Sequence, residues 1–477
     1  MHVRRRRLAI QPTIARLAAL TGAGLLLVGA TACVEKVESA DDTSPSATAD
    51  PGLSAGNEDL TPDVVGGTLA DGPTVVARFP GAETSFGTLP TQPVAAGDGE
   101  PIKIGMINQE GTPLGSFPDV RLGAEAAVAF INTELGGIDG RPIEFIPCIT
   151  TFSPEKSQAC AQQLVQDGVV AVLGGLDITS NGSIPVLEQN DLAYVGGVPV
   201  NLVDMTSPIS FQFSGGSPGA YVAFADHASK AGANNVVVAY GDYPPIKTAA
   251  VDYGADILRA RGVETVTELP FPITTTDFLP VLSKAAESNP DAIFLAAADT
   301  ACAPAMKTAH DLGIEAQLYF VGSCASPLIA DQIGAEAVTG NIFNIEGPVI
   351  AEPGNIEGAL NSAVVGKYGD PTLVTAGIGT VSFRAMMNLY SVLTEIGGDA
   401  MSSAAVLETL RSAKDRPSFN GHPYTCDGQQ VPALPALCSP QQILVQSNGS
   451  GLDQVGDWID VPAIVAETGV GSTDANG

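Results

Sequence analysis

Basic residues are scarce in this chain of 477 residues, in which 22 Lys and Arg face 52 Asp and Glu for a formal net charge of −30. Such an acidic protein repels the phosphates of nucleic acids and anionic lipids, and no basic patch with interleaved aromatic residues occurs. We therefore exclude a nucleic-acid partner. The acidity is interpreted as a source of solubility, and it does not by itself require a cationic ligand.

Histidine and the motifs of common enzymes are also rare. The four histidines stand at positions 2, 227, 310 and 422, and none lies at metal-ligand spacing from another. This argues against a His-based metal site, and no motif implies a cofactor. The sequence contains no Gly-x-Ser-x-Gly elbow, Walker loop or His-Glu-x-x-His motif. We therefore do not expect an enzyme, and a secreted hydrolase that uses scattered carboxylates remains a minor alternative.

The one long apolar run of the N-terminal region covers residues 17–30 and follows four consecutive arginines. It is shorter than the ~20 residues of a membrane-spanning helix. Together with the small residues after it, this pattern predicts a signal peptide over residues 1–32 that is removed on export. The four residues ending at Cys33 resemble the lipobox of bacterial lipoproteins, although Ala30 stands where leucine is usual. The resemblance implies lipidation of Cys33, and the alternative is an ordinary signal followed by an unrelated cysteine.

Residues 33–100 have little apolar periodicity and are rich in Ser, Thr, Asp, Gly, Ala and Pro. A segment of this composition buries too little apolar surface to offset its ordering entropy. We interpret it as a flexible tether between a lipid anchor and a folded region. Within it, only residues 74–79 favour a short strand.

From residue 101 onward, short runs of Val, Ile, Leu and Ala alternate with helical patterns. The spacing predicts a strand over 102–107 and a helix over 120–135 that ends at two glycines. Ser-Pro-Glu at 153–155 is typical of a helix start. Strands that are apolar on both faces occur in parallel sheets covered by helices. The sequence thus predicts an α/β fold with two doubly wound, Rossmann-like halves of about five strands each.

Several short stretches of the sequence are informative about its family when their order and spacing are considered together. They are IKIG at 102–105, FIN at 130–132, GGIDGRP at 136–142, QLV at 163–165, VLGG at 172–175, NPDAIF at 289–294 and LGI at 312–314. In this arrangement the chain resembles the type I periplasmic binding proteins, and among them the leucine-binding family of ABC-transporter receptors. The resemblance implies two lobes with a ligand cleft between them and a hinge that closes over the ligand.

The same resemblance implies the division of the chain into lobes. Lobe 1 would comprise residues 101–218 and 347–440, and lobe 2 would comprise residues 219–346 and 441–466. Residues 467–477 would form a tail.

The loop at 174–180 follows the third expected strand, at the sheet edge where open α/β sheets bind ligands. The family resemblance implies that Thr179 and Ser180 bind a ligand carboxylate through hydroxyls and backbone N–H groups. Either residue could instead only cap the following helix. Asp177 belongs to the same candidate site, although a carboxylate pointing inward would disfavour an anionic ligand.

The other ligand-binding positions of the family fall on different residue types in this chain. Phe117 corresponds to an aromatic residue near the first loop, and Tyr243 lies close to a family tyrosine. Ser323 stands where the family has the glutamate that binds the ligand's ammonium group. Asp299 could bind a cation in place of that glutamate, or it could serve only as a helix N-cap.

Seven cysteines occur, and six remain if Cys33 carries lipid. In an oxidising compartment disulfides persist, and six cysteines allow 15 connectivities. Nearness along the chain suggests the pairs Cys148–Cys160, Cys302–Cys324 and Cys426–Cys438.

We expect from these observations a monomeric, extracytoplasmic lipoprotein on the outer face of the cell membrane. It would bind a small polar ligand, such as an amino acid or a related amide or carboxylate, and deliver it to an ABC permease by hinge closure. The alternative is a ligand sensor or adaptor of the same fold that serves another membrane partner.

Overall fold

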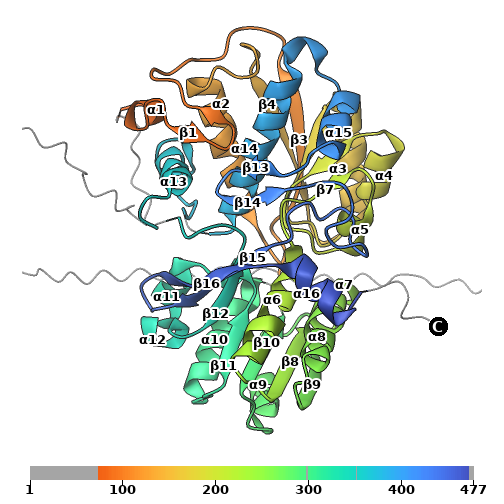
Figure 1. Cartoon of the computed structure of the whole chain (residues 1–477), viewed down its shortest axis with the longest axis vertical. Helices are drawn as coiled ribbons and strands as arrows, with labels where there is room; N and C mark the ends of the chain where they lie inside the picture. Colours follow the sequence, from red (N-terminus) through yellow and green to blue (C-terminus); the bar gives the residue numbers. More distant parts are fainter. Residues whose placement is uncertain (1–72, 297–298, 351, 376, 472–477) are drawn as a thin grey trace, which may run out of the picture. The chain divides into compact units, whose positions relative to one another are not determined.

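The computed structural model describes residues 73–296, 299–350, 352–375 and 377–471 (Figure 1). By its internal contacts the chain divides into Met1–Asn57 and Glu58–Gly477, and all described residues belong to the second unit. The expected signal peptide, the lipidation candidate Cys33 and residues 33–72 of the expected tether lie outside the described residues.

Five parallel strands form the first sheet, in the order β4-β3-β5-β6-β7. Their bounds are β3 (Ile102–Gln109), β4 (Ile143–Thr150), β5 (Ala171–Gly174), β6 (Ala193–Val195) and β7 (Ser210–Phe211). The helices that follow these strands are α2 (Pro118–Glu134), α3 (Pro154–Asp167), α4 (Ile184–Gln189) and α5 (Leu202–Thr206). In register, Ile104 of β3 pairs with Phe145 of β4 and with Ala171 of β5.

Seven strands form the second sheet, in the order β16-β15-β12-β11-β10-β8-β9. They are β8 (Asn235–Gly241), β9 (Thr265–Phe271), β10 (Ala292–Ala296), β11 (Gln317–Phe320), β12 (Ile342–Ile345), β15 (Gln442–Ser447) and β16 (Leu452–Ile459). Strands β8 to β12 run parallel, whereas β15 and β16 add to the edge in antiparallel pairing. This sheet therefore exceeds the five strands expected for each half.

Helices and turns of the second sheet complete the α/β alternation (Figure 1). They are α6 (Gly216–Lys230), α7 (Pro244–Lys247), a π-helical stretch (Thr248–Ala255), α8 (Asp256–Ala260), α9 (Leu279–Ala286), a 3-10 turn (Asp299–Ala301), α10 (Cys302–Asp311), a 3-10 turn (Gly322–Cys324), α11 (Pro327–Ile333), α12 (Ala335–Val338) and α16 (Val461–Thr468).

The chain crosses between the two sheets three times. It passes from β7 to α6, returns after β12 to α13 (Ile356–Tyr368), and crosses again between β14 (Gly421–Tyr424) and β15. The returning segment also holds α14 (Gly379–Ile396), a 3-10 turn (Gly398–Ala400), α15 (Ser403–Arg411) and β13 (Arg416–Ser418), which pairs with β14. Because α14 packs against α2 and β5, this segment belongs to the first sheet. We call the elements around the first and second sheets lobe 1 and lobe 2.

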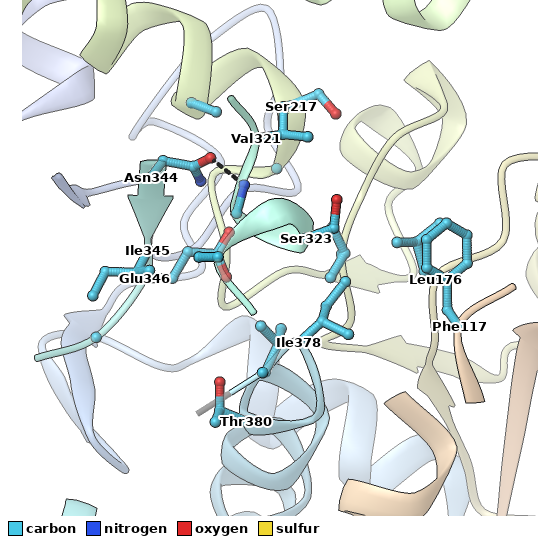
Figure 2. Close-up of a pocket in the computed structure, with 18 of the residues that line it drawn as sticks. Phe117, Leu176, Ser217, Val321, Ser323, Asn344, Ile345, Glu346, Ile378 and Thr380 are labelled. Carbon is cyan, nitrogen blue, oxygen red and sulfur yellow. Dashed lines mark hydrogen bonds between the residues drawn. The ribbon is translucent and has the colours of Figure 1, made fainter. Parts of the chain in front are cut away.

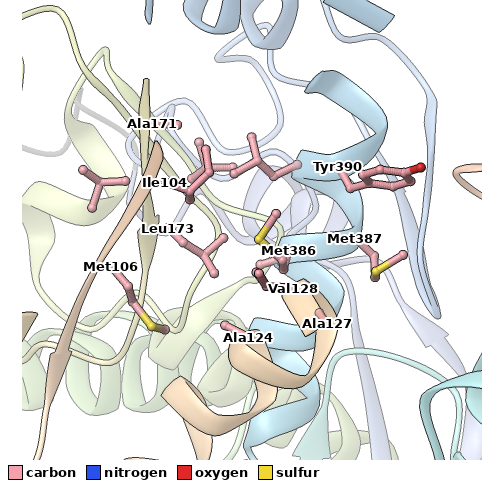
Figure 3. Packing of buried hydrophobic residues seen from close by; sticks show 14 of the residues in the cluster. Ile104, Met106, Ala124, Ala127, Val128, Ala171, Leu173, Met386, Met387 and Tyr390 are labelled. Carbon is pink, nitrogen blue, oxygen red and sulfur yellow. The ribbon is translucent and has the colours of Figure 1, made fainter. Parts of the chain in front are cut away.

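The core of lobe 1 lies between the sheet and the helix pair α2 and α14. Figure 3 shows side chains of β3 and β5, such as Ile104 and Leu173, meeting Val128 of α2 and Met386 of α14. Ile104, Leu173 and Met386 are fully buried. Burying each side chain of this size stabilises the fold by roughly 1.5–3 kcal/mol. Strands covered on both faces bury residues at successive positions, which explains the continuous apolar runs in the sequence.

The helix start expected at 153–155 is confirmed as the start of α3. The Ser153 hydroxyl accepts a hydrogen bond from Lys156 N at 3.2 Å, and Pro154 occupies the first turn. The helix ends at Gly168, whose φ of 73° places it in the left-handed region that glycine adopts easily.

Two sequence-based expectations for residues 73–100, which we call the strap, are wrong. The strand expected over 74–79 is instead the short helix α1 (Val75–Arg78), because the buried Glu134 carboxylate accepts the backbone N–H groups of Val75 and Val76 at 2.9 and 2.8 Å. This part of the expected tether is also not loose, since Val76 and Leu89 are buried in the core of lobe 1.

The strap continues as a small hairpin, β1 (Glu83–Thr84) with β2 (Gly87–Thr88). Between its strands, the Phe86 ring lies 5.8 Å from the Tyr390 ring and 6.0 Å from the Phe419 ring, measured between centroids. The aromatic side chain therefore supplies the apolar contact that composition alone did not reveal.

Disulfides join the three cysteine pairs expected from nearness along the chain. Cys148–Cys160 connects β4 to α3, Cys302–Cys324 connects α10 to the turn after β11, and Cys426–Cys438 closes a loop after β14. Among the described helices, none combines the length and apolarity that crossing a membrane requires. The described residues also contain no cluster of three or more His, Cys, Asp or Glu suited to a metal ion.

Candidate functional site

A cavity of about 190 Å³ lies where the carboxyl ends of strands from both sheets meet. Lobe 1 contributes the loops after β3, β5 and β6, and lobe 2 contributes the ends of β10, β11 and β12 together with parts of α6 and α7. The start of α14 lies along the same cavity. Open parallel sheets bind ligands at this edge, so the topology itself identifies the candidate site.

Most lining side chains are aliphatic or aromatic. They are Leu114, Phe117, Leu176, Ile178, Val198, Val200, Ala220, Tyr221, Ile246, Ala249, Ile273, Ala296, Val321, Ala325, Ile345, Pro348, Val349, Ile350, Ile378, Val381, Phe419 and Leu452. The polar side chains of the lining are Ser217, Ser323, Asn344, Glu346, Asn361, Thr380, Arg384 and Asn420, several of which appear in Figure 2.

Buried amides at the end of β3 shape the loops of lobe 1. Asn108 donates to Phe117 O at 2.8 Å and accepts from Leu176 N at 3.0 Å, so one side chain fixes two lining loops. Gly115 has a φ of 123°, and a Cβ there would lie 2.8 Å from the Phe117 ring. Glycine at this position therefore leaves the space that the Phe117 ring occupies in the cavity wall.

The charged groups of the lining are an ion pair. Arg384 Nη2 of α14 lies 2.7 Å from Glu346 Oε2, just after β12, and both side chains are more than nine-tenths buried. The Ser214 hydroxyl donates to the other carboxylate oxygen of Glu346, and Arg384 also donates to the Glu346 backbone oxygen. Because α14 belongs to lobe 1 and β12 to lobe 2, this pair connects the lobes beside the cavity.

A second buried link joins two of the crossing segments. Asn344 at the end of β12 accepts from Gly322 N at 2.8 Å (Figure 2) and donates to Gln442 Oε1 at 2.9 Å. Gln442 begins β15, directly after the third crossing. Specific hydrogen bonds therefore hold the crossing segments together.

The structure brings two of the seven predicted ligand residues to this cavity, Phe117 and Ser323. Phe117 is buried in the wall, whereas Ser323 lies partly exposed in the turn after β11. Both come from loops that follow strand ends and lie at the cavity, as mapping by strand order predicts, and their binding of a ligand stays a prediction.

Asp177, Thr179 and Ser180 lie outside the described lining. All three are buried, and Asp177 accepts hydrogen bonds from Thr150 Oγ1 at 3.2 Å, Ser157 Oγ at 2.6 Å and both the N–H and the hydroxyl of Thr179. The Thr179 hydroxyl thus binds the protein's own carboxylate, whereas the buried Ser180 hydroxyl has no hydrogen-bond partner among the described residues. Neither hydroxyl caps the following helix, because α4 begins at Ile184 with Ser183 as its N-cap and without a side-chain cap.

Tyr243 and Asp299 also lie outside the described lining. The Tyr243 ring, after β8 of lobe 2, packs 5.7 Å from the Phe152 ring, after β4 of lobe 1, so it links the lobes rather than facing the cavity. Asp299 begins the 3-10 turn before α10, and its side chain is outside what the structure describes.

Sequence reasoning missed Glu346, Arg384 and Thr380. A signal for Arg384 existed, because it is the one basic residue in the otherwise apolar and neutral sequence of α14 before Glu395. An arginine in a buried helix implies a buried acidic partner. Glu346 gave no such signal, since the partner stands 38 residues away in the other lobe.

The sequence pattern of a family described as "Periplasmic binding protein" matches residues 101–434. No curated protein sequence matches the chain. Among solved structures, a leucine-binding protein from Thermotoga maritima has a TM-score of 0.62 at 20% identity, covering 75% of this chain and 98% of that one.

Two further solved structures share the fold. A fatty acid ABC transporter substrate-binding protein from Thermomonospora curvata has a TM-score of 0.66 at 15% identity, covering 78% of this chain and 96% of its own. A solute-binding protein of an ABC transporter from Rhodopseudomonas palustris, in complex with p-hydroxybenzoic acid, has a TM-score of 0.63 at 20% identity, with coverages of 76% and 97%. The chain therefore belongs to the periplasmic binding protein family and has the two-lobed α/β fold of its type I members.

Proposed function

We propose that this protein is a lipid-anchored extracytoplasmic receptor that binds a small molecule by hinge closure and delivers it to an ABC permease. The observation that supports it best is a cavity bounded by strand ends of both lobes, beside three chain crossings. Solved structures of the same fold include transporter substrate-binding proteins. The role requires binding and closure, and no bond chemistry.

The anchor and the division of the chain are parts of the same proposal. Export would remove residues 1–32, lipidation would fix Cys33 to the outer face of the membrane, and residues 33–72 would form the tether. The lobe bounds proposed from sequence, 101–218 with 347–440 and 219–346 with 441–466, place each chain crossing near a lobe boundary.

Small-angle scattering tests hinge closure. The mature chain would be measured with its co-purified ligand, identified by native mass spectrometry, and again after the ligand has been removed by unfolding and refolding. We expect the radius of gyration to increase on removal, because the lobes separate. A bound ligand whose removal leaves the scattering curve unchanged would contradict closure.

Anchoring and delivery need separate measurements. Replacing Cys33 with alanine should release the chain from the membrane fraction, and retention there would refute the lipid anchor. The loaded receptor should stimulate the ATPase activity of its permease in proteoliposomes. Stimulation of a membrane kinase instead, with no effect on any permease, would favour the sensor alternative.

A further inference from the structure

The described walls of the cavity are apolar on both lobes. Ile178 and Val200 come from lobe 1, Ile246 and Val321 come from lobe 2, and Ile378 precedes α14. These residues belong to separate segments of the chain, so the apolar character is not confined to one patch. A ligand enclosed by such walls gains free energy mainly by removing its own apolar surface from water.

The charged side chains of the described lining already neutralise each other. Glu346 and Arg384 form the buried ion pair, and the remaining carboxylate oxygen of Glu346 accepts from Ser214. A zwitterionic amino acid would need a cationic and an anionic partner of its own, because an unpaired buried charge is costly. The net charge of −30 adds a field that disfavours anions.

Neutral hydrogen-bonding groups remain available at the same cavity. The hydroxyls of Ser217, Ser323 and Thr380, all partly exposed, have no hydrogen-bond partner in the described part of the chain (Figure 2). Two further lining residues, Tyr221 and Asn361, have a buried hydroxyl and a buried amide nitrogen that find no hydrogen-bond partner among the described residues. Hydroxyl and amide groups of this kind complement a neutral oxygen, such as that of an alcohol or a carbonyl.

The size of the cavity limits the ligand. A dry apolar cavity of about 150 Å³ accommodates benzene, which has six heavy atoms. By the same measure a cavity of about 190 Å³ accommodates about eight heavy atoms. A substituted single ring or a medium aliphatic chain has this size.

We propose that the cavity selects an uncharged, largely apolar molecule of about this size that carries one hydroxyl or carbonyl oxygen, and that it excludes free amino acids. The proposal rests on the proposed function, because it names the ligand class of the same site. It replaces the small polar ligand expected from sequence, since Asp177, Thr179 and Ser180 lie outside the described lining.

Calorimetric titration of the mature chain at neutral pH tests the ligand class with four probes: octan-1-ol, octanoate, L-leucine and L-phenylalanine. The first two have equal chain lengths and differ in charge. Octan-1-ol should bind at least about tenfold more tightly than octanoate, and neither amino acid should bind, because the two charged side chains of the described lining already pair with each other. Tighter binding of octanoate or of either amino acid, or no binding of octan-1-ol, overturns the proposal.

Substitutions locate the binding at this cavity. Ile378→Gln should weaken octan-1-ol binding about tenfold by placing an amide in the apolar wall. Ile356→Gln is the matched control, because Ile356 is 47% exposed and outside the described lining, and it should leave the affinity unchanged. If Ile378→Gln fails to fold, Val321→Thr, which is close in shape, should weaken binding about fivefold. Unchanged affinity in the folded wall variant overturns the assignment.

The ligand class and the proposed function can fail separately. Octan-1-ol that binds without reducing the radius of gyration would leave the ligand class standing and contradict hinge closure. Contraction of the chain with L-leucine but not with octan-1-ol would support hinge closure and contradict the ligand class. In that case Asp299→Asn should abolish leucine binding if Asp299 is the cation partner, and the neutral-ligand proposal would be rejected.

Discussion

At the scale of single residues, the ion pair of Glu346 and Arg384 is the most consequential contact that sequence analysis did not predict. Its two members come from different lobes and lie beside the cavity, so the pair is a direct polar link between the lobes. A buried ion pair contributes little compared with an apolar pair of the same shape. Removing only one member, however, leaves an uncompensated charge.

Single substitutions of this pair should therefore be far more damaging than the double substitution. Glu346→Gln or Arg384→Met should each lower the free energy of unfolding by about 3–5 kcal/mol, and the double variant should recover most of the loss. Urea denaturation measures all three values. Single variants within about 1 kcal/mol of the unsubstituted chain would show that the charges are solvated.

Asp204 gives a residue-scale prediction about pH. Burial, helped by the nearby Asp177 charge, raises the pKa of its carboxyl to about 7, although hydrogen bonds from the backbone N–H groups of Asn201 and Val200 oppose the shift. The folded chain thus binds this proton more tightly than the unfolded chain does. The stabilisation that protonated Asp204 gives the folded chain is fully present below about pH 4 and is lost as the pH rises through about 7.

Comparison with Asp204→Asn isolates this effect from the other carboxylates. Between pH 4.5 and pH 7.5, the stability of the unsubstituted chain relative to the variant should fall by a few kcal/mol, since each pKa unit corresponds to about 1.4 kcal/mol. Parallel pH profiles of the two proteins in urea denaturation would contradict a raised pKa at Asp204.

The structural role of a residue was predictable from the sequence where its partners are close along the chain. Ser153 capped its helix as expected because its partner, Lys156 N, is three residues away. The hydrogen bonds of Asp177, predicted as a ligand residue, were not predictable because Thr150 and Ser157, which donate to its carboxylate, stand 27 and 20 residues away. Long-range polar partners decide whether a loop carboxylate faces a ligand or the protein, and a single sequence does not contain them.

At the scale of elements, the strap shows how one buried side chain overrides local propensity. Adjacent valines favour a strand, yet the Glu134 carboxylate organises Val75 and Val76 as the start of a helix, and the Tyr368 hydroxyl donates to the same carboxylate. The strap also precedes the region that the family pattern matches. Its composition resembled a linker, and only its few buried residues, such as Leu89, distinguish it from one.

Glu134→Gln should release the strap from lobe 1. An amide can accept only part of these hydrogen bonds, so the free energy of unfolding should fall by about 1.5–3 kcal/mol, and residues 73–100 should become sensitive to limited proteolysis. Glu144→Gln, at an exposed position of β4, is the matched control and should change neither property. Unaltered protease resistance of the Glu134 variant would show that apolar contacts alone retain the strap.

At the scale of the whole molecule, the alternation of elements was predictable because apolar runs and helix caps are local signals. The second sheet was underestimated, since β15 and β16 come from the C-terminal segment and join it only through pairing with β12. The apolar character of the cavity was likewise not predictable from the sequence. Its walls combine single residues from many loops, and no stretch of the sequence contains more than a few of them.

The Phe152–Tyr243 contact leads to a prediction about the balance between open and closed forms. It joins the loop after β4 of lobe 1 to the loop after β8 of lobe 2, so it exists only while these loops of the two lobes are together. An aromatic pair contributes about 0.5–1.5 kcal/mol beyond its buried area. Tyr243→Ala should therefore shift the population toward the open form and weaken ligand affinity by about 2- to 10-fold.

Scattering and titration together check this expectation. Without ligand, the Tyr243→Ala chain should have a larger radius of gyration than the unsubstituted chain, and ligand should return it to the same closed value because the cavity itself is intact. Tyr253→Phe is a suitable control, since its ring lies in the core of lobe 2 and outside the described cavity lining. If affinity falls while the ligand-free radius is unchanged, Tyr243 acts through a direct ligand contact, and the closure argument at this position is wrong.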